Sequence, residues 1–449
     1  SACASAPTAA PSADDQASVD PPEPATTDPS EPATTDPSEP ADGSEYVLEN
    51  GLRVVLRPER GSGQVAVLVS YDIGELHDPA GLSGLAHFAE HLYITAGTAE
   101  SPPRTVDEFV ADHPLGWNAQ TTRTASIFAA VATTDRLTDE LTDAAGRMTG
   151  LTITPDLVET ERGRILAETS NMFGGIPVLA AQNLAKEAVA PTPGDGRRGG
   201  DPDTLASLDV ATLESRLDEY YKPTNAMLVV TGDFDADATA ELIASLFGGI
   251  APGTAIGAPA EVEPAPPTII DVTVPAPDPS VGADDGIVAL GLAMPAGDAP
   301  TYPAALVLVQ RLFVTAGQGD IQVGYALLED PTVLTVSTAI APDEDATTAV
   351  ERLTTTVADV VAAPLGPSEA STVVSQFGPL LGIEPYPSGY VSQNPYQPAL
   401  TAALGSSAVP DPAAVRGWLG SLTPEQLAAA ADLLDPAAAG VVTITHGPG

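Results

Sequence analysis

The sequence predicts an α+β protein of two tandem homologous domains, each an antiparallel-rich β-sheet with helices packed on one face. Its 449 residues exceed one compact core and fit two domains of about 200 residues each. Short apolar runs typical of strands are grouped apart from longer runs with helical periodicity, as in layered α+β folds. A helix leading to a buried strand also occurs twice, over residues 210–230 and 424–444.

Charge is the most unusual feature of the composition. The chain carries 61 acidic and 17 basic residues, a formal net charge of −44, while 43% of its residues are apolar and can form cores. A surface of this sign repels nucleic acid and anionic lipid headgroups, so we expect no nucleic-acid partner. Because the acidic residues are spread along the chain, we favour a role in solubility over an acidic site for a cationic substrate.

Residues 1–44 differ from the rest in composition. They are mostly Pro, Ala, Thr, Ser, Asp and Glu, and one eight-residue unit occurs twice, from Glu23 and from Glu31. Such a segment has little to bury and is expected to be a disordered tether. Its Ser-Ala-Cys start resembles the end of a bacterial lipobox and predicts lipidation at Cys3, the alternative being a lone cysteine in a disordered tail. We therefore expect an exported protein of the bacterial periplasm or cell surface, held at a membrane only by this lipid anchor.

Residues 45–250 are predicted to form the first domain. Asn50-Gly51, between two apolar runs, is a strong hairpin signal. Periodicity and turn residues predict strands at 46–48, 52–56, 65–71 and 226–230. They predict helices at 84–93, 105–111, 134–148, 155–171, 178–190, 210–220 and 236–247.

Residues 251–267 are rich in Pro, Ala and Gly and are predicted to link the domains. Residues 268–449 are predicted to form the second domain, which has the same fold without the motif described below. Its expected strands are 269–274, 286–292 and 441–444, its first helix is 302–314, and further elements are expected at 334–340, 346–362, 368–380 and 424–434.

One motif, His87-Phe88-Ala89-Glu90-His91, carries the expected chemistry. In a helix, positions i, i+3 and i+4 share one face, so both imidazoles and the Glu90 carboxylate point the same way. Two neutral imidazoles one turn apart suit zinc, and a carboxylate beside them can take a proton from water that the metal acidifies. This order of residues is the inverzincin motif. The alternative is two surface histidines on an amphipathic helix. Because the chain has only five histidines in 449 residues, the motif would rarely arise by chance.

A catalytic zinc ion needs a third protein ligand and an open fourth position. Two candidates, Glu161 and Glu168, stand seven residues apart in the predicted helix 155–171 and share one face. The spacing of the residues leaves both open. We expect one Zn²⁺ per chain, although the same donors also accept manganese or cobalt.

With Glu168 following His91 by 77 residues, the sequence resembles the pitrilysin/insulinase family of metallopeptidases, family M16. Residues 116–121, Gly-Trp-Asn-Ala-Gln-Thr, are similar to the strand that lines the family's cleft. Residues 220–226 and 230–233 are similar to the end of its first domain. The resemblance covers residues 45 to 250 well and residues 268–449 only in outline.

The resemblance implies a role for each motif residue. It implies that zinc binds to His87, His91 and Glu168. Glu90 would activate water and pass the proton to the leaving amine, while Glu161 would orient a metal-binding histidine. The implied enzyme is a zinc metalloendopeptidase that hydrolyses peptides or unfolded segments in an enclosed chamber.

The resemblance also implies that Asn118 and Ala119 pair with an extended peptide substrate by strand addition. The alternative for Asn118 is a turn or edge residue without contact to substrate. These two residues complete the set of expected site residues.

The sequence departs from the family at an arginine and a tyrosine that fix the substrate and stabilise the tetrahedral intermediate in many members. Leu328 and Thr335 stand where these residues are expected. We therefore expect a hetero-dimer with a paralogous subunit that supplies the arginine and tyrosine, a homodimer being possible. Two alternatives remain, a non-catalytic scaffold or peptide-binding subunit of the same family and a lipoprotein that only sequesters zinc.

Overall fold

The computed structural model describes residues 44–172, 177–193, 197–262, 268–274, 286–319, 321–325, 332–366, 368–386, 390, 394–409 and 411–446. Cys3, the rest of the expected tether up to residue 43, and Leu328 lie outside the described residues. Within these ranges, no helix combines the length and the apolar character that crossing a membrane requires.

A six-stranded sheet forms the first half of the fold. Its strands are β1 (Ser44–Val47), β2 (Arg53–Pro58), β3 (Gln64–Tyr71), β4 (Trp117–Thr121), β5 (Ser126–Thr133) and β6 (Ala226–Gly232). They lie in the order β1-β2-β6-β3-β5-β4, and only β2 and β6 run parallel. The predicted hairpin at Asn50-Gly51 is confirmed, and Gly51 there has a φ of 91°, which favours glycine. The short strand β4 is left at one edge.

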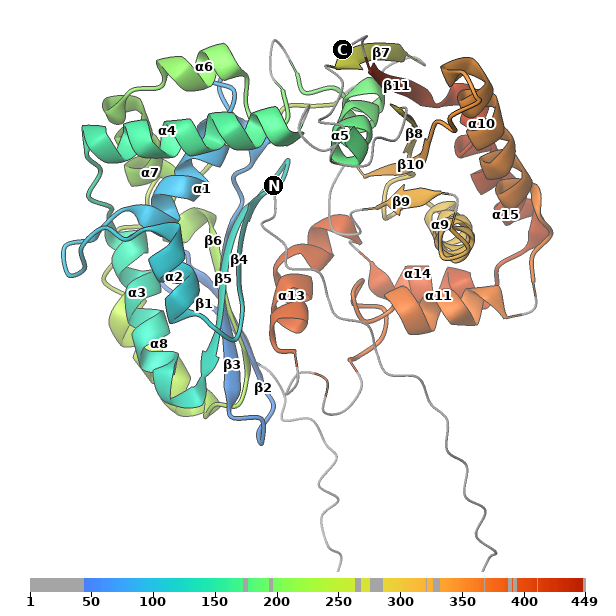
Figure 1. Ribbon diagram of the computed structural model, residues 1–449. Helices are drawn as coiled ribbons and strands as arrows, with labels where there is room; N and C mark the ends of the chain where they lie inside the picture. The colour runs from blue at the N-terminus through green and yellow to red at the C-terminus, as the bar shows by residue number, and fades with distance from the viewer. Residues whose placement is uncertain are drawn as a thin grey trace, which may run out of the picture.

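Helices cover one face of this sheet (Figure 1). The helices in direct contact with it are α1 (Leu85–Thr95), α3 (Leu137–Thr149) and α8 (Ala236–Phe247). Around α1 pack α2 (Val106–Asp112), α4 (Pro155–Ser170) and α7 (Val210–Tyr220), and α6 (Pro202–Ser207) packs on α4. Along β3, Val65 and Val67 join the core under these helices, whereas Ala66 and Leu68 face the opposite way. Strand side chains alternate between the two faces of a sheet, so these apolar residues make both faces of β3 apolar. Both faces must therefore be covered.

A five-stranded sheet forms the second half. Its strands are β7 (Ile269–Val274), β8 (Gly286–Ala293), β9 (Gln322–Gly324), β10 (Val333–Ala339) and β11 (Gly440–His446), in the order β7-β11-β8-β10-β9. Only β7 and β11 run parallel. Its helices are α9 (Tyr302–Ala316), α10 (Ala346–Ala362), α11 (Glu369–Phe377), α14 (Pro412–Gly420) and α15 (Pro424–Leu433). The predicted α+β class with two sheets of the same architecture is confirmed.

Each sheet has its second face covered by a helix from the other half of the chain. Helix α5 (Pro177–Val189) packs on β8, β10 and β11, and α13 (Tyr396–Ala408) packs on β3 and β6. Figure 1 shows α5 beside the second sheet and α13 beside the first. Close approach of α5 requires glycine, since a Cβ on Gly291 would lie 2.2 Å from the Ala185 carbonyl oxygen. We call this arrangement the helix exchange.

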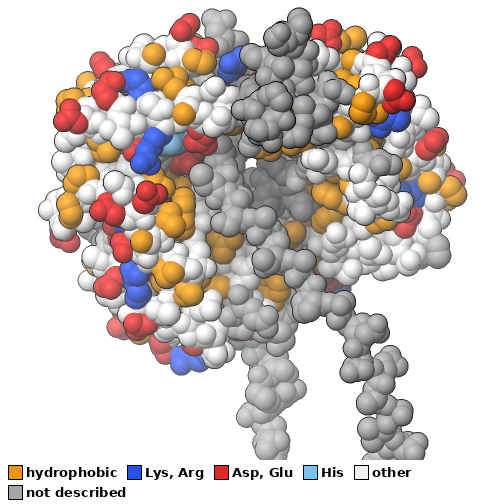
Figure 2. Space-filling view, in the orientation of Figure 1, with side chains coloured by type: hydrophobic (Ala, Val, Ile, Leu, Met, Phe, Trp, Pro, Cys, Tyr) orange, Lys and Arg blue, Asp and Glu red, His pale blue; other side chains and the backbone are white. Residues whose placement is uncertain are grey.

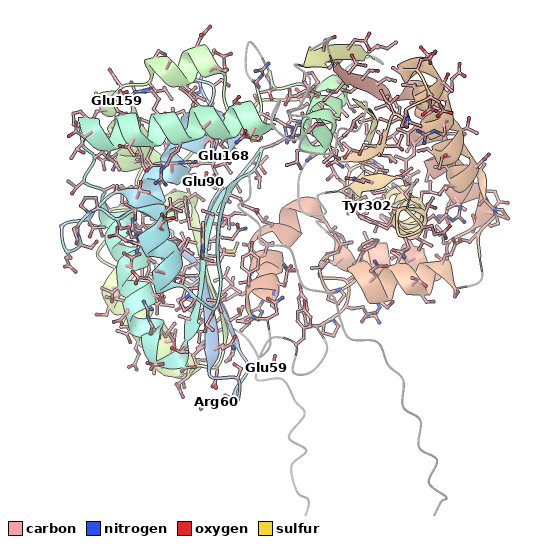
Figure 3. The ribbon with its side chains drawn as sticks, in the orientation of Figure 1. Glu59, Arg60, Glu90, Glu159, Glu168 and Tyr302 are labelled. Atoms are coloured by element: carbon pink, nitrogen blue, oxygen red, sulfur yellow. The ribbon has the colours of Figure 1, made fainter. Side chains whose placement is uncertain are left out.

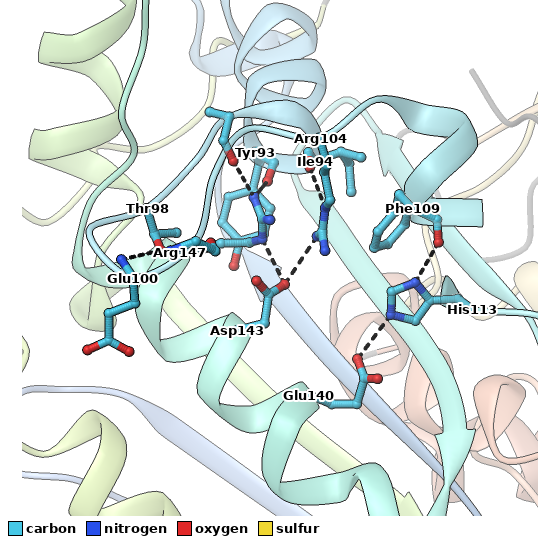
Figure 4. A network of polar contacts seen from close by, with 12 residues as sticks. Tyr93, Ile94, Thr98, Glu100, Arg104, Phe109, His113, Glu140, Asp143 and Arg147 are labelled. Carbon is cyan, nitrogen blue, oxygen red and sulfur yellow. Dashed lines mark hydrogen bonds and ion pairs between the residues drawn. The ribbon is translucent and has the colours of Figure 1, made fainter. Parts of the chain in front are cut away.

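A partly buried ion-pair network fixes the C-terminal end of α1 (Figure 4). Asp143 of α3 accepts hydrogen bonds from Arg147 (2.8 Å) and Arg104 (3.1 Å). Arg147 also donates to the carbonyl oxygens of Tyr93 and Ala96 at the end of α1, at 2.5 and 3.0 Å. Two cations therefore lie where the helix dipole is negative, and they hold α1 on α3.

Candidate metal centre and active site

The helix that carries the His-Glu-His motif begins at a closely packed point. Gly84 caps α1 with a φ of 94°, and a Cβ there would approach the Gly200 Cα to 2.8 Å. The half-buried carboxylate of Asp78 accepts hydrogen bonds from the N–H groups of Gly84 (2.8 Å) and Ala86 (2.9 Å). The two glycines thus let the loop at 197–200 close onto the first turn of α1.

The two imidazoles lie one turn apart on α1, with ring centroids 5.0 Å from each other. Nδ1 of His87 is 2.7 Å from the Gly199 carbonyl oxygen, and Nδ1 of His91 is 3.0 Å from Oε2 of Glu161. A carbonyl or carboxylate oxygen only accepts, so each Nδ1 carries the proton and donates it. In the neutral rings each Nε2 then keeps a lone pair, which is the tautomer that metal binding needs.

Glu168 of α4 faces both Nε2 atoms. Its Oε2 is 3.4 Å from Nε2 of His91 and 3.8 Å from Nε2 of His87. One ligand atom from each of the three residues lies within 4.8 Å of the others. Ligands held about 2.1 Å from a tetrahedral zinc ion stand about 3.4 Å apart, so this donor set fits zinc after small side-chain shifts. Glu90 on α1 and Glu168 on α4 lie at the same corner of the first half (Figure 3).

Of the two candidate metal ligands on α4, Glu161 does not face the metal position. It lies on the far side of the His91 ring. Its side chain is only 2% exposed, and its contact with His91 is to the ring nitrogen remote from Glu168. Burial by itself lowers the pKa of His91, but the hydrogen bonds to Glu161 and Glu168 and the charge of Glu90 outweigh it and raise the pKa to about 9. The surrounding carboxylates therefore favour positive charge at this point, as a proton or as a metal ion.

Glu90 is 5% exposed and is held by the edge strand. It accepts a 2.7 Å hydrogen bond from Oγ1 of Thr121, the last residue of β4. This contact leaves lone pairs on the carboxylate for a further donor. The Glu90 carboxylate can therefore accept a proton next to the position that the three ligand atoms surround.

Asn118 and Ala119 lie on β4, which pairs only with β5 among the described strands. Ala119 is buried toward the helices, while the Asn118 amide donates a 2.7 Å hydrogen bond to the Tyr396 hydroxyl of α13. The outer edge of β4 ends at Thr121 and thus next to Glu90. An extended peptide added to this edge would reach the metal centre.

The loop residues that position His87 were not identified from the sequence. The Gly199 carbonyl accepts from His87, and the Gly199 N–H donates to Oε1 of Glu75 at 2.7 Å. A backbone carbonyl leaves no mark on the residue type, so only the Gly199-Gly200 pair indicated a special backbone here. Gly199 has a φ of 73°, which favours glycine.

The second half offers no free hydroxyl at Thr335, the position where a tyrosine is expected. Thr335 is fully buried in β10, and its Oγ1 donates to the Gly324 carbonyl. All three arginines that follow residue 268 in the sequence pair with glutamates. These pairs are Arg311 with Glu369, Arg352 with Glu344, and Arg416 with Glu384.

The chain is similar to known protein families and to individual proteins. Residues 53–190 match the family model described as insulinase (peptidase family M16), and residues 207–318 match the model described as peptidase M16 inactive domain. The chain is 25% identical over 218 residues to the uncharacterized zinc protease YmxG of Bacillus subtilis, covering 47% of this chain and 52% of that protein. It is 24% identical over 220 residues to the probable mitochondrial-processing peptidase subunit beta of Schizosaccharomyces pombe, covering 48% of each. The matches thus span about half the length of these relatives.

Among solved structures, a protease from Helicobacter pylori superimposes with a TM-score of 0.72 at 19% identity. The superposition covers 90% of this chain and 99% of that one, so it includes the second half, where the family models match least. At this identity the likeness concerns the fold.

Proposed function

The chain belongs to the insulinase family of peptidases, family M16, and on this premise we propose that it is a zinc-dependent endopeptidase. The observation that supports the proposal most is the convergence of His87, His91 and Glu168, with both Nδ1 atoms engaged elsewhere and both Nε2 atoms facing the carboxylate. These three residues would hold the zinc ion. Manganese or cobalt would fit the same donors.

The residues of the chain would then have separate roles in the proposed reaction. Zinc, when bound, supplies Lewis acidity that acidifies water and polarises the peptide carbonyl. Glu90 accepts the proton of the attacking water on its carboxylate and returns it to the nitrogen of the leaving amine. Thr121 orients that carboxylate through its hydroxyl. Glu161 and Gly199 hold the two imidazoles in the metal-binding tautomer.

Asn118 and Ala119 would bind the substrate through the backbone of the edge strand β4. An extended or unfolded segment can add to an exposed edge, because main-chain hydrogen bonds do not depend on side-chain identity. We therefore propose peptides or unfolded segments as the substrate class.

We further propose that a paralogous partner completes the active site. Thr335 already donates within its own sheet, and each arginine of the second half has a glutamate partner. A site without a cation and a phenol lacks the donors that stabilise a developing oxyanion. A paralogue bearing an arginine and a tyrosine would supply both, whereas a second copy of this chain in a homodimer would bring only the same paired arginines and Thr335.

A non-catalytic scaffold or peptide-binding subunit is the second candidate. It is favoured by the match of residues 207–318 to the model for inactive domains of this family. The intact motif and its supporting hydrogen bonds favour the enzyme, because a scaffold has no need of a buried carboxylate beside a metal site.

One experiment separates these two functions. The full chain is purified with and without its co-expressed paralogue, and zinc content and hydrolysis of unstructured peptides are measured on the same samples. The proposal expects about one zinc ion per chain and turnover that rises strongly with the partner. Zinc without turnover in either sample would support the scaffold, full turnover of the chain alone would refute the partner requirement, and absence of zinc would refute the metal site.

Export and lipidation at Cys3 remain a separate proposal, supported by the lipobox-like start and the polar composition of residues 1–44. Mass spectrometry of the membrane-associated protein would test it. An unmodified Cys3 in that fraction would contradict it.

A further inference from the structure

A cavity of about 200 Å³ lies at the opposite end of β4 from the metal centre. It is bounded by the first residues of β4 and by the segment that leads into α13. Leu115, Trp117 and Val131 form one side, and Pro395 and Tyr396 form the other. Leu115 is 46% exposed at the rim, so an apolar side chain remains in contact with solvent there. The walls combine these apolar residues with the amides of Gln64 and Asn394, and they come from both halves of the chain.

Hydrogen bonds hold the wall formed by Pro395 and Tyr396 against the first sheet. The Asn118 amide donates to the Tyr396 hydroxyl at 2.7 Å, and the buried Thr231 hydroxyl donates to the Pro395 carbonyl oxygen. Helix α13, which Tyr396 begins, lies against the first sheet (Figure 1). The cavity is therefore built into the fold before any ligand binds, which lowers the entropy cost of binding.

The cavity lies on the path of a peptide paired with β4. Thr121 at one end of the strand contacts Glu90, and Trp117 at the other end borders the cavity. Four residues of strand advance about 13 Å, and a paired peptide advances by the same rise. Since β4 runs toward the metal centre, an antiparallel peptide runs away from it. The cavity is then reached four or five residues after the cleaved bond.

The side-chain directions agree with this path. Trp117, Ala119 and Thr121 point to the helix-covered side, and Asn118 points to the side where Tyr396 lies. Alternate side chains of an added peptide would point to that second side and so over the cavity. Because neighbouring side chains alternate, the side chain of either the fourth or the fifth residue after the cleaved bond would enter the cavity.

We propose that this cavity is a substrate subsite that takes a bulky aliphatic or aromatic side chain four or five residues after the cleaved bond. The proposal rests on the proposed peptidase function and adds a selectivity that backbone pairing cannot supply. Acidic side chains are disfavoured there, because no basic side chain lines the cavity and the chain is strongly acidic. Figure 2 shows acidic side chains spread over both halves of the face in view.

A library of unstructured peptides tests the subsite whichever bond is cleaved. The full chain, with its paralogue where turnover needs it, digests the library, and mass spectrometry maps each cleaved bond. Leucine and phenylalanine should be enriched, and aspartate and glutamate depleted, at the fourth or fifth residue after the bond. For one cleaved peptide, replacing that residue by glycine should lower kcat/KM about tenfold.

Two matched variants assign the preference to the cavity. Leu115→Asp changes the rim and should abolish the enrichment, while short peptides that end before the cavity are cleaved at the unchanged rate. Val110→Asp is the control, because Val110 is similarly exposed, at 41%, on α2 outside the cavity. No enrichment at either position, or an enrichment that survives Leu115→Asp, would overturn the proposal.

A readout that needs no turnover keeps the subsite distinct from the catalytic proposal. In the Glu90→Gln protein, a bound peptide with leucine at that position should slow amide hydrogen exchange of Tyr396 and of residues 115–121, more than its glycine counterpart does. Such a difference without hydrolysis by the wild type would support the subsite and count against the enzyme. Hydrolysis without such a difference would do the reverse.

Discussion

The hydroxyl of Thr121 donates a 2.7 Å hydrogen bond to the carboxylate of Glu90. It joins the last residue of the edge strand to the proposed proton acceptor, although the two lie on different elements. A peptide that pairs with β4 would therefore be placed by the same strand that orients Glu90. Substrate position and proton transfer would thus depend on one short stretch of chain.

Replacing Glu90 by glutamine should abolish turnover and leave the metal in place. The amide has nearly the same shape but cannot take a proton, and general base catalysis is worth about 10²–10⁴-fold. Zinc content and kcat are measured on the same sample, and Glu100→Gln, an exposed change beyond the end of α1, is the control. Turnover that persists in the Glu90 variant would contradict the assigned role.

Replacing Glu161 by glutamine should weaken metal binding about 10–100-fold without removing a ligand, because Nδ1 of His91 loses its charged acceptor. Competition with a chromophoric zinc chelator measures the affinity. The matched control is Glu159→Gln, since Glu159 is exposed on the same helix and lies away from the metal centre (Figure 3). Equal affinity in both variants would assign Glu161 a purely structural role.

Chelation should destabilise the folded protein. The metal would bind only where α1 and α4 are assembled, so zinc at a thousandfold excess over its Kd adds about 4 kcal/mol to the free energy of unfolding. Urea unfolding with and without chelator measures the difference, and adding zinc back should restore it. A His91→Ala variant should show no response, and a response of wild-type size there would place the stabilising metal elsewhere.

Acid should weaken the network around Asp143. Burial raises the pKa of Asp143, but Arg147 and Arg104 outweigh this and lower it below the usual range. As pH falls below about 4, the unfolded chain takes up this proton before the folded one, so the free energy of unfolding falls. Asp143→Asn should lower it by about 2 kcal/mol near pH 7 and make its decline in acid shallower.

Urea unfolding at pH 7 and at about pH 3.5 checks this, with Asp139→Asn as the control because Asp139 is exposed on the same helix. A parallel decline in acid for wild type and the Asp143 variant would show that other groups determine acid stability.

Local signals in the sequence were sufficient for most elements of the fold. The Asn-Gly turn predicted the first hairpin, and α4, predicted at 155–171, has the expected start with Thr154 as the capping residue. Strand β5 was not predicted, because its continuous apolar run lacks alternation. Helix α13 was not predicted either, since its Pro398, Gly405 and serines disfavour a helix, and packing on the first sheet is among the contacts that stabilise it.

Local signals in the sequence likewise predict only part of the candidate site. The helical spacing of His87 and His91 is a local signal, so their shared direction could be predicted, whereas the choice between Glu161 and Glu168 depends on how α4 crosses α1. The role of the Gly199 carbonyl could not be foreseen, because any residue has one. The sequence also does not indicate which sheet α5 covers, because an apolar helix face does not identify its partner.

The helix exchange also determines how the chain can be divided. Cutting the connection between the sheets would not release them, because α5 and α13 still reach across and each lies on the opposite partner. Removing either half would leave the other with an apolar β surface open to water, a template for aggregation. A nicked molecule can therefore persist as one body, whereas neither sheet with its own helices is a self-sufficient folding unit.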